Sequence, residues 1–420
     1  MATSLTAAIP ASQATEKPPH ALALPAFRNL WIGSTISLLG DQFYLVALPW
    51  LVLQLTNSSL ALGTVLMIAA IPRAALMLVG GAITDRFSAR GVLLVTAAMR
   101  TVLVGAVASL VGFHAIHLWH LYLLTFAFGV ADAFSFPAGA ALLPSLLEPQ
   151  QLHAANAFMQ SSALATQLVG RAPAGLAIRR WGIAPALFLD AASFLAVIFA
   201  LLGIPKRVPS EDGTRVAMQR RRGMWRSIAE GLQAVRQDRA LLSLMAVSAT
   251  INICVSGPIG VGLTSVAKFK FGSAAAFGTF LSCFSGGTLA GLMLGGMLKN
   301  PRKRGLQFIG MSAFAGLALV AIGWILNFAV IATMLALMGL AVGFVNVQFS
   351  TWMQTRVARE LLGRVMSVLM FAAVGLIPVS YALSGVVARW SVSALLVGAG
   401  ALLIVASAGA LFAKGAREID

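Results

Sequence analysis

Long apolar stretches, separated by short charged or glycine-containing turns, recur along the whole chain of 420 residues. Two examples are LYLLTFAFGVADAFSFPAGAALLPSLL at 121–147 and SALLVGAGALLIVASAGALFA at 393–413. Because an α-helix rises about 1.5 Å per residue and the hydrocarbon core of a bilayer is about 30 Å thick, roughly 20 apolar residues predict a membrane-spanning helix. Twelve such helices are predicted, at residues 30–54, 59–83, 91–113, 118–142, 154–178, 183–204, 240–263, 274–298, 307–327, 329–352, 364–388 and 391–413.

The polar interruption at 205–239 is the longest between the predicted helices and divides them six and six. The two halves also resemble each other, since GGAITDRFSARG at 80–91 is echoed by GGMLKNPRKRG at 295–305. Such a duplication is typical of transporters that bind their substrate between two halves near the middle of the bilayer. We therefore expect an all-α membrane protein with twelve transmembrane helices in two pseudo-symmetric six-helix bundles. Its regions are an N-terminal tail (1–26), an N-terminal bundle (27–204), a linker (205–239), a C-terminal bundle (240–413) and a C-terminal tail (414–420).

The second part of the linker has the pattern of an amphipathic helix. Trp225, Ile228, Leu232 and Val235 fall on one helical face, and basic residues surround them. Such a helix is expected to lie along the cytoplasmic membrane surface. A disordered linker is the alternative.

Charge is scarce but strongly biased in position. The chain is 59% hydrophobic and 10% charged, with a net charge of +17. If the N-terminus is cytoplasmic and the helices alternate in direction, 22 of the 30 lysines and arginines fall in cytoplasmic segments. Five fall in outside loops, and three, Arg73, Arg100 and Arg171, fall within predicted helices. This is the positive-inside bias, so the basic excess indicates topology beside anionic lipid and not nucleic acid binding. Both termini and the linker are predicted to be cytoplasmic.

The turn after the second predicted helix has a recognisable pattern: a glycine, three residues, Asp-Arg and then a basic residue. These positions are Gly81, Asp85, Arg86 and Arg90. The pattern resembles the signature loop between helices 2 and 3 of the major facilitator superfamily, and the chain resembles this family over nearly its whole length. FPAGAALLPSLLEPQQLHAANA at 136–157 and FLDAASF at 188–194 are similar to the twelve-helix exporters that include macrolide-efflux and enterobactin-export proteins.

The resemblance implies that the loop is a gate. Asp85, placed in a short cytoplasmic loop, would bind a helix end and arginine partners when the transporter is open outward. A plain solvated turn is the alternative. The antiporter motif of helix 5 is degraded to GRAPAG at 170–175, where Pro173 and Gly175 match well and Gly170 opens the motif.

Three acidic residues, Asp41, Asp132 and Asp190, fall within predicted spans. An ionisable residue inside a membrane is costly and therefore marks a functional hypothesis. In the family fold, helices 1 and 4 line the cavity, so Asp41 and Asp132 are expected to face the pathway and to handle protons, with Arg73 neutralising one of them. Helices 3 and 6 are supports in that fold, so Arg100 and Asp190 are expected to form a structural pair. Structural pairing is also the alternative for Asp41 and Asp132.

The second half has no acidic residue within a predicted span, so any proton chemistry belongs to the first half. The polar residues expected to line a substrate cavity are Gln42, Asn252, Asn346 and Gln348. No Walker A loop, zinc-ligand spacing or nucleophile elbow occurs, which argues against an ATP-driven pump, a metal site or an enzyme. No cofactor is expected.

We expect a monomeric, multi-pass protein of the bacterial inner membrane. It would be a secondary transporter that exports small amphipathic molecules, such as a drug, macrolide or siderophore, by alternating access and proton antiport. The alternatives are uptake or lipid transport by the same fold, or a transport-dead membrane sensor or scaffold. The expected partners are the small-molecule substrate, protons and membrane lipids, and no nucleic acid.

Overall fold

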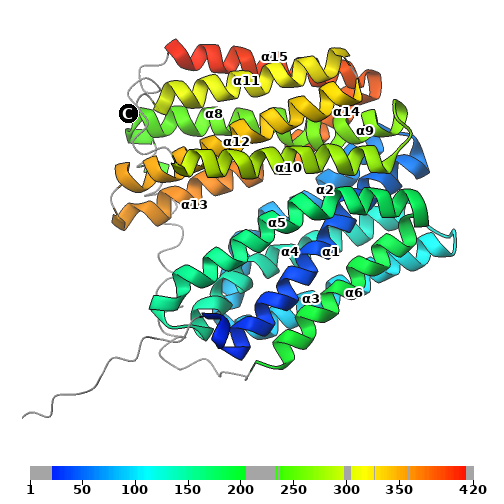
Figure 1. Cartoon of the computed structure of the whole chain (residues 1–420), viewed down its shortest axis with the longest axis vertical. Helices are drawn as coiled ribbons and strands as arrows, with labels where there is room; N and C mark the ends of the chain where they lie inside the picture. The colour runs from blue at the N-terminus through cyan, green and yellow to red at the C-terminus, as the bar shows by residue number, and fades with distance from the viewer. Residues whose placement is uncertain are drawn as a thin grey trace, which may run out of the picture.

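The computed structural model describes residues 21–204, 232–233, 236–297, 304–325, 327–357 and 359–412. For residues 77–86, 239–240, 243–244, 304, 354–355, 359–364, 367 and 372 it describes the helix backbone without the side chains. Apart from short turns the described chain is helical, and it contains no strand (Figure 1). The predicted amphipathic helix of the linker falls mostly outside the described residues.

The N-terminal bundle has six helices: α1 (Pro25–Thr56), α2 (Ser59–Arg86), α3 (Ala89–Gly112), α4 (Leu118–Leu146), α5 (Pro149–Trp181) and α6 (Ile183–Leu202). A short 3₁₀ turn, η1 (Ala21–Ala23), precedes α1, and Ala21 is buried. The described helical structure therefore extends into the predicted tail, where Pro25 stands at the start of α1, a position that suits proline.

The C-terminal bundle contains α8 (Arg239–Gly257), the π-helical segment η2 (Pro258–Leu263), α9 (Thr264–Phe269), α10 (Ala274–Met297), α11 (Arg304–Ile325), α12 (Phe328–Arg356), α13 (Arg359–Gly375), α14 (Ile377–Trp390) and α15 (Val392–Phe412). α8, η2 and α9 follow one another as a single crossing, and so do α13 and α14.

Eleven helical segments of the described chain are long and apolar enough to cross a membrane. The twelfth predicted crossing corresponds to α5, which has 33 residues but carries glutamine, serine and arginine between its apolar positions. The predicted order of helices is therefore present, with one crossing that is markedly more polar than the others.

Two crossings depart from a regular α-helix. The crossing that begins with α8 continues to Phe269, beyond the predicted end at 263, through the π-helical segment. This irregularity is caused by Ser380 of α14. Its Oγ accepts a hydrogen bond from the backbone N–H of Gly257 at 2.7 Å and donates one to the carbonyl oxygen of Ile253 at 2.6 Å. A side chain inserted in this way into a helical ladder is a known cause of such irregularity.

The predicted helix 364–388 is interrupted at Leu376, between α13 and α14. Gly375 precedes the break and Pro378 follows it. Proline lacks a backbone N–H donor and crowds the preceding turn, so the helix restarts there instead of running through.

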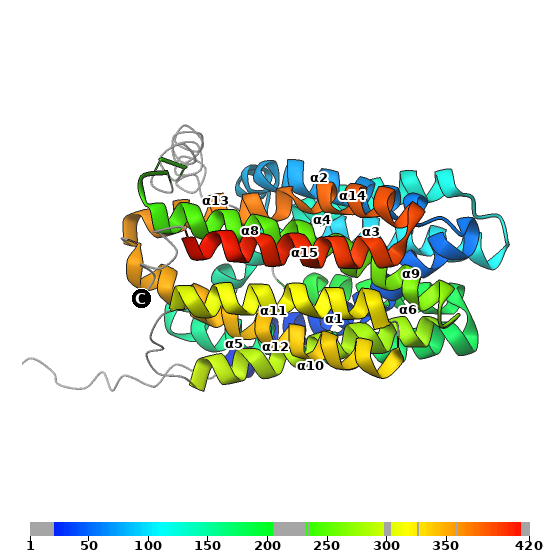
Figure 2. The same ribbon diagram turned by 90° about the horizontal axis from the view of Figure 1, so that it is seen from above.

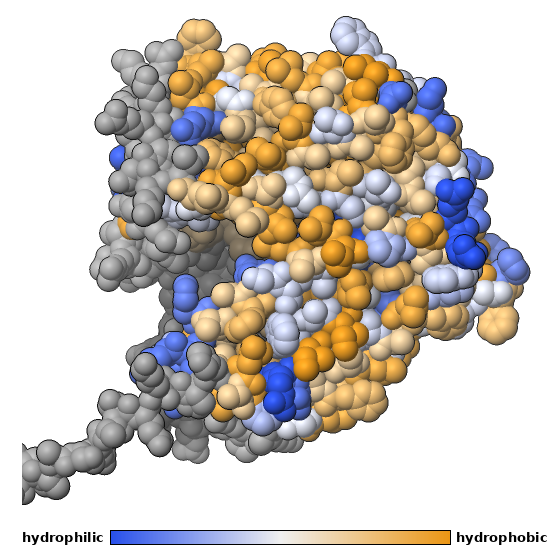
Figure 3. Space-filling model, viewed as in Figure 1, coloured by the Kyte–Doolittle hydropathy of each residue, from blue (hydrophilic) through white to orange (hydrophobic). Residues whose placement is uncertain are grey.

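The bundles lie side by side, and the helices of the N-terminal bundle are inclined to those of the C-terminal bundle (Figures 1 and 2). We call the end where α6 finishes and α8 begins the linker end, and the opposite end the distal end. The bundles are joined at the distal end: the hydroxyl groups of Ser59 and Ser265 lie 2.8 Å apart, and Nζ of Lys268 lies 5.1 Å from the Trp50 ring centre. Toward the linker end the space-filling view shows a hollow between the bundles (Figure 3).

Glycines allow this close junction. α2 crosses α14 where Gly63 faces Gly385, and a Cβ atom added to Gly63 would lie 2.6 Å from the Cα of Gly385. Only residues without a side chain let two helices approach this closely, a device common in membrane proteins. The molecule is therefore closed at the distal end and open toward the linker end.

Candidate functional site

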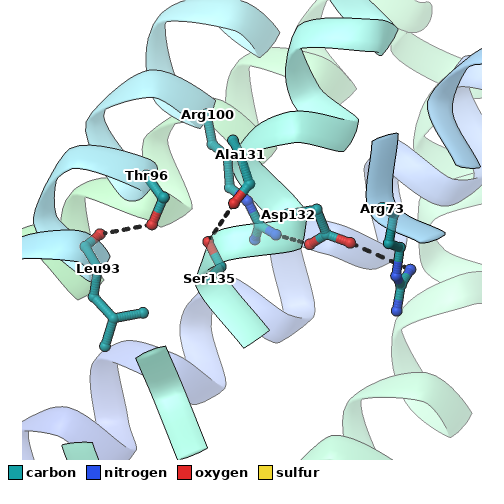
Figure 4. A network of polar contacts seen from close by, with 7 residues as sticks. All are labelled: Arg73, Leu93, Thr96, Arg100, Ala131, Asp132 and Ser135. Atoms are coloured by element: carbon teal, nitrogen blue, oxygen red, sulfur yellow. Dashed lines mark hydrogen bonds and ion pairs between the residues drawn. The ribbon is translucent and has the colours of Figure 1, made fainter. Parts of the chain in front are cut away.

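A network of charged side chains lies inside the N-terminal bundle (Figure 4). Asp132 of α4 is held between two arginines: its Oδ2 lies 3.3 Å from Nη1 of Arg73 in α2, and its Oδ1 accepts a hydrogen bond from Nη2 of Arg100 in α3. The side chains of Arg100 and Asp132 are 13% and 22% exposed, whereas that of Arg73 is 53% exposed. Arg100 is thus the interior partner, and Arg73 the partner at the open edge.

Aromatic rings position Arg100. Its guanidinium carbon lies 5.1 Å from the ring centre of Phe128 in α4 and 5.6 Å from that of Phe194 in α6. Tyr44 of α1 stacks on the ring of Phe128, with ring centres 4.6 Å apart. Cations favour such sites, most strongly where water is excluded. The rings therefore hold the guanidinium at the centre of the bundle.

The expected structural pair of Arg100 and Asp190 is not formed, since Arg100 bonds Asp132 instead. The rings of Phe128 and Phe194 flank the guanidinium and leave its Nη2 directed at α4. Asp190 is fully buried, and neither of its carboxyl oxygens has a hydrogen-bond partner among the described residues.

Asp41 of α1 lies within electrostatic range of both Arg100 and Arg73. It forms no ion pair within 4 Å with the side chains that the structure describes. The three acids and two of the three arginines singled out in the sequence are thus brought into one region. Arg73 contacts Asp132, one of the two acids considered as its partner, whereas the bond between Arg100 and Asp132 was not expected.

Gln42 is engaged inside the protein and is not turned toward a cavity, contrary to expectation. Its Oε1 accepts from Nε of Arg171 in α5 at 3.0 Å, and its Nε2 donates to the Leu38 carbonyl at 2.9 Å. Arg171 also reaches the other bundle, where its Nη1 donates to Oγ of Ser285 at 2.6 Å. Arg171 was visible in the sequence as an intramembrane charge, but its bridging position could not be deduced from one helix.

The helix 5 motif forms the contact between α5 and its neighbours. A Cβ atom on Gly170 would lie 2.7 Å from Cγ of Gln42, and one on Gly175 would lie 2.5 Å from the Ala274 carbonyl oxygen in α10. Pro173 lies between these two glycines inside α5. The motif therefore packs α5 against α1 on one side and against the C-terminal bundle on the other.

The gate residues lie mainly on helices and not in a loop. Gly81, Asp85 and Arg86 belong to α2, which runs to Arg86, and Arg90 lies in the first turn of α3. Only the side chain of Arg90 is described among these four: its Nε donates to the Leu201 carbonyl of α6 at 2.7 Å. The last carbonyls of a helix have no intrahelical partner and favour a nearby cation, so Arg90 caps α6.

The C-terminal bundle contains a cavity of about 410 Å³ between α8, α11, α12 and α13. Asn252 and Asn346 line it together with apolar side chains, among them Met311, Phe349 and Met370. Gln348 does not line it, because this side chain is buried and donates to the Gly295 carbonyl of α10 at 3.2 Å. Two residues of α12 only two positions apart thus face different neighbours.

Two helical bundles joined at one end around a hollow, with ion-paired charges inside membrane-spanning helices, define a multi-pass membrane transporter. The model of the Major Facilitator Superfamily matches residues 30–378, and the chain belongs to this family. The fold class predicted from the sequence is confirmed.

Relatives support the same assignment. The chain is 25% identical over 350 residues to macrolide efflux protein A of Streptococcus pyogenes, covering 81% of this chain and 84% of that protein. It is 26% identical over 371 residues to the multidrug efflux pump Tap of Mycobacterium tuberculosis, covering 86% of each.

Among solved structures, a bacterial homologue of the iron transporter ferroportin, in an inward-facing state, superposes with a TM-score of 0.71. It shares 16% identity and covers 94% of this chain and 99% of its own. The nucleoside transporter NupG superposes with a TM-score of 0.68 at 13% identity, covering 92% and 98%. At these identities the likeness establishes the fold alone.

Proposed function

We propose that the protein is a proton-coupled exporter of small amphipathic molecules, working by alternating access. The observation that carries the proposal is the network of Arg73, Asp132 and Arg100 inside the N-terminal bundle. Buried charges of this kind are expensive in a membrane and mark ion or substrate pathways. The efflux proteins similar to this chain support the direction of transport.

Asp41 is the first choice for the coupling carboxyl, and Asp132 the second. Two arginines contact Asp132 directly, whereas Asp41 lies near the same arginines without a close ion pair. Burial disfavours a charged carboxylate, and a nearby cation favours it. A carboxyl group on which both effects act gains or loses its proton when its surroundings change. A substrate that competes with the proton for Asp41 couples the two fluxes.

The cargo would be held mainly by the C-terminal bundle. Its cavity of about 410 Å³ is apolar, with the amide groups of Asn252 and Asn346 as hydrogen-bonding groups. A mostly apolar site with a few polar groups is typical of small-molecule binding. This composition fits an amphipathic drug, macrolide or siderophore.

In the proposed orientation the linker end faces the cytoplasm of a bacterium, with both termini on that side, in the inner membrane. The arginine and lysine bias in the sequence supports this topology. The protein would work as a monomer among membrane lipids, with a gate at the motif of Gly81, Asp85, Arg86 and Arg90.

The test is transport in proteoliposomes with a pH gradient imposed in either sense, using a panel of macrolides, lipophilic cations and siderophores. Wild-type protein should accumulate a substrate against its gradient only when protons flow the other way. Asp41→Asn should lose this accumulation and keep downhill exchange. Glu148→Gln, which removes an exposed carboxylate at the linker end, is the matched control.

The outcomes separate the candidate functions. Accumulation driven by the opposite gradient would indicate uptake. Movement of labelled lipid instead of the panel would indicate a lipid transporter. No flux of any compound, with Asp41→Asn indistinguishable from wild type, would favour a sensor or scaffold. Uphill transport by Asp41→Asn at the wild-type rate would transfer the coupling role to Asp132.

A further inference from the structure

Two complementary groups remain unmatched beside each other in the N-terminal bundle. Both carboxyl oxygens of Asp190 are buried without a hydrogen-bond partner among the described residues, and so is Nε of Arg100. The two side chains lie within electrostatic range of each other. Nε of Arg100 is a buried donor and the carboxyl group of Asp190 is a buried acceptor, and each could satisfy the other. Their mismatch indicates that the observed pairing of Arg100 with Asp132 is one of two pairings open to Arg100.

The surroundings of Arg100 are symmetrical in a way that supports two pairings. On α4, Phe128 and Asp132 are four residues apart, and on α6, Asp190 and Phe194 are four residues apart. Residues at this spacing share one face of a helix. The guanidinium lies 5.1 Å from the Phe128 ring and 5.6 Å from the Phe194 ring, so each of the two helices that approach it carries a ring and a carboxyl group on one face.

The charges around Asp190 do not neutralise it in this conformation. α6 packs against α1 and α3, and more lightly against α5. α1 presents Asp41 and Tyr44, and α3 presents Arg100, which is engaged by Asp132. Arg171 of α5 is directed at Gln42 and Ser285. An ionised carboxylate without hydrogen bonds is strongly disfavoured in a dry interior, whereas the neutral acid is tolerated.

Water has little access to the group. α1 lies so close to α6 that a Cβ atom on Gly40 would collide with the side chain of Ser193 and would come within 3.0 Å of Oδ1 of Asp190. The backbone of α1 therefore keeps water away from the carboxyl group of Asp190, so water does not supply the missing hydrogen bonds.

We propose that Asp190 is a proton-binding site, and that Arg100 alternates between Asp132 and Asp190. With Arg100 on Asp132, Asp190 holds the proton. When a proton neutralises Asp132, Arg100 turns to Asp190 and displaces its proton, so the pair carries one proton before and after the exchange. The inference adds a second proton site to the proposed function and does not depend on Asp41 or on the direction of transport.

The experiment reads the protonated carboxyl directly. Infrared spectra of the full-length protein in lipid vesicles at neutral pH should contain the C=O stretching band of a buried carboxylic acid. The band should disappear in Asp190→Asn, shift in Asp190→Glu and persist in Glu148→Gln. It should also disappear in Asp132→Asn, in which Asp190 is intact but Arg100 is free to pair with it.

The decisive variant is Asp132→Asn. If Asp190 had only a structural role, its C=O stretching band would not change when Asp132 is replaced. A band that is insensitive to Asp190→Asn and to Asp190→Glu would overturn the proton site. A band that persists in Asp132→Asn would overturn the exchange of Arg100. Since no substrate is involved, these outcomes are independent of the transport test of Asp41.

Discussion

The junction of α2 and α14 is a place where one added side chain should shift the conformational equilibrium. In Gly63→Val, Cβ would start 2.6 Å from Cα of Gly385 and 2.7 Å from the carbonyl oxygen of Tyr381. Ordinary contacts of a Cβ atom are 3.4–4 Å. The two helices would therefore have to separate by about 1 Å or more, and both colliding atoms belong to backbone that cannot rotate away.

The magnitude follows from this overlap. Overpacking of a well-packed contact costs about 1–3 kcal/mol. In the proposed alternating-access cycle the two helices separate here when the distal end opens, so the cost would fall only on the state in which the distal end is closed. At about 1.4 kcal/mol per factor of ten, the population ratio of the two states should move by roughly 5- to 150-fold toward opening of the distal end.

Distances between spin labels would measure this shift. On a cysteine-free background, one pair of labels at Asn57 and Lys270 reports on the distal end, and a second pair at Gln150 and Met297 reports on the linker end. Gly63→Val should lengthen the distal distance and shorten the linker-end distance. Gly139→Val is the matched control, because a Cβ atom there would meet nothing within 4 Å. If both distance distributions in Gly63→Val equal those of the wild type, the junction is not the closing contact.

Three further predictions concern topology, gating and stability. A membrane-impermeant thiol reagent applied outside the cell should label Ser273→Cys but not Ser210→Cys, and the reverse pattern would overturn the topology. Asp85→Asn should slow turnover while the protein is inserted at wild-type level, and an unchanged transport rate would remove the gating role. Ser380→Ala should lower the thermal stability by about 1–3 kcal/mol, because the buried N–H of Gly257 loses its acceptor. Reaction of the buried thiol of Cys254 on heating measures this last effect, and an unchanged melting temperature would contradict it.

The number and order of the helices follow from the sequence because hydrophobic length is a local property. Depth along a helix is local as well. Counted along the predicted helices at about 1.5 Å per residue, Asp132 and Arg73 lie at a similar level in the membrane, and in the structure they lie 3.3 Å apart. What the sequence does not contain is the rotation of each helix about its axis.

Arg100 illustrates this difference. By depth it could reach either Asp190 or Asp132, and the choice depends on the rings of two other helices, Phe128 and Phe194. Similarly, Asn346 and Gln348 are both polar residues of one apolar helix, yet only Asn346 lines the cavity. Contacts between segments distant in the chain decide both cases, and hydropathy carries no information about them.

The polar character of α5 has a consequence for how the chain enters the membrane during synthesis. An arginine near the centre of a helix opposes insertion by about 2.5–3.5 kcal/mol, and Arg171 is accompanied by several glutamines and serines. The acceptors for its guanidinium include Gln42 of α1 and Ser285 of α10, and Ser285 is synthesised more than a hundred residues after Arg171. A nascent chain released after α5 should therefore leave this segment outside the bilayer, and α6 would be needed to draw it in as a hairpin.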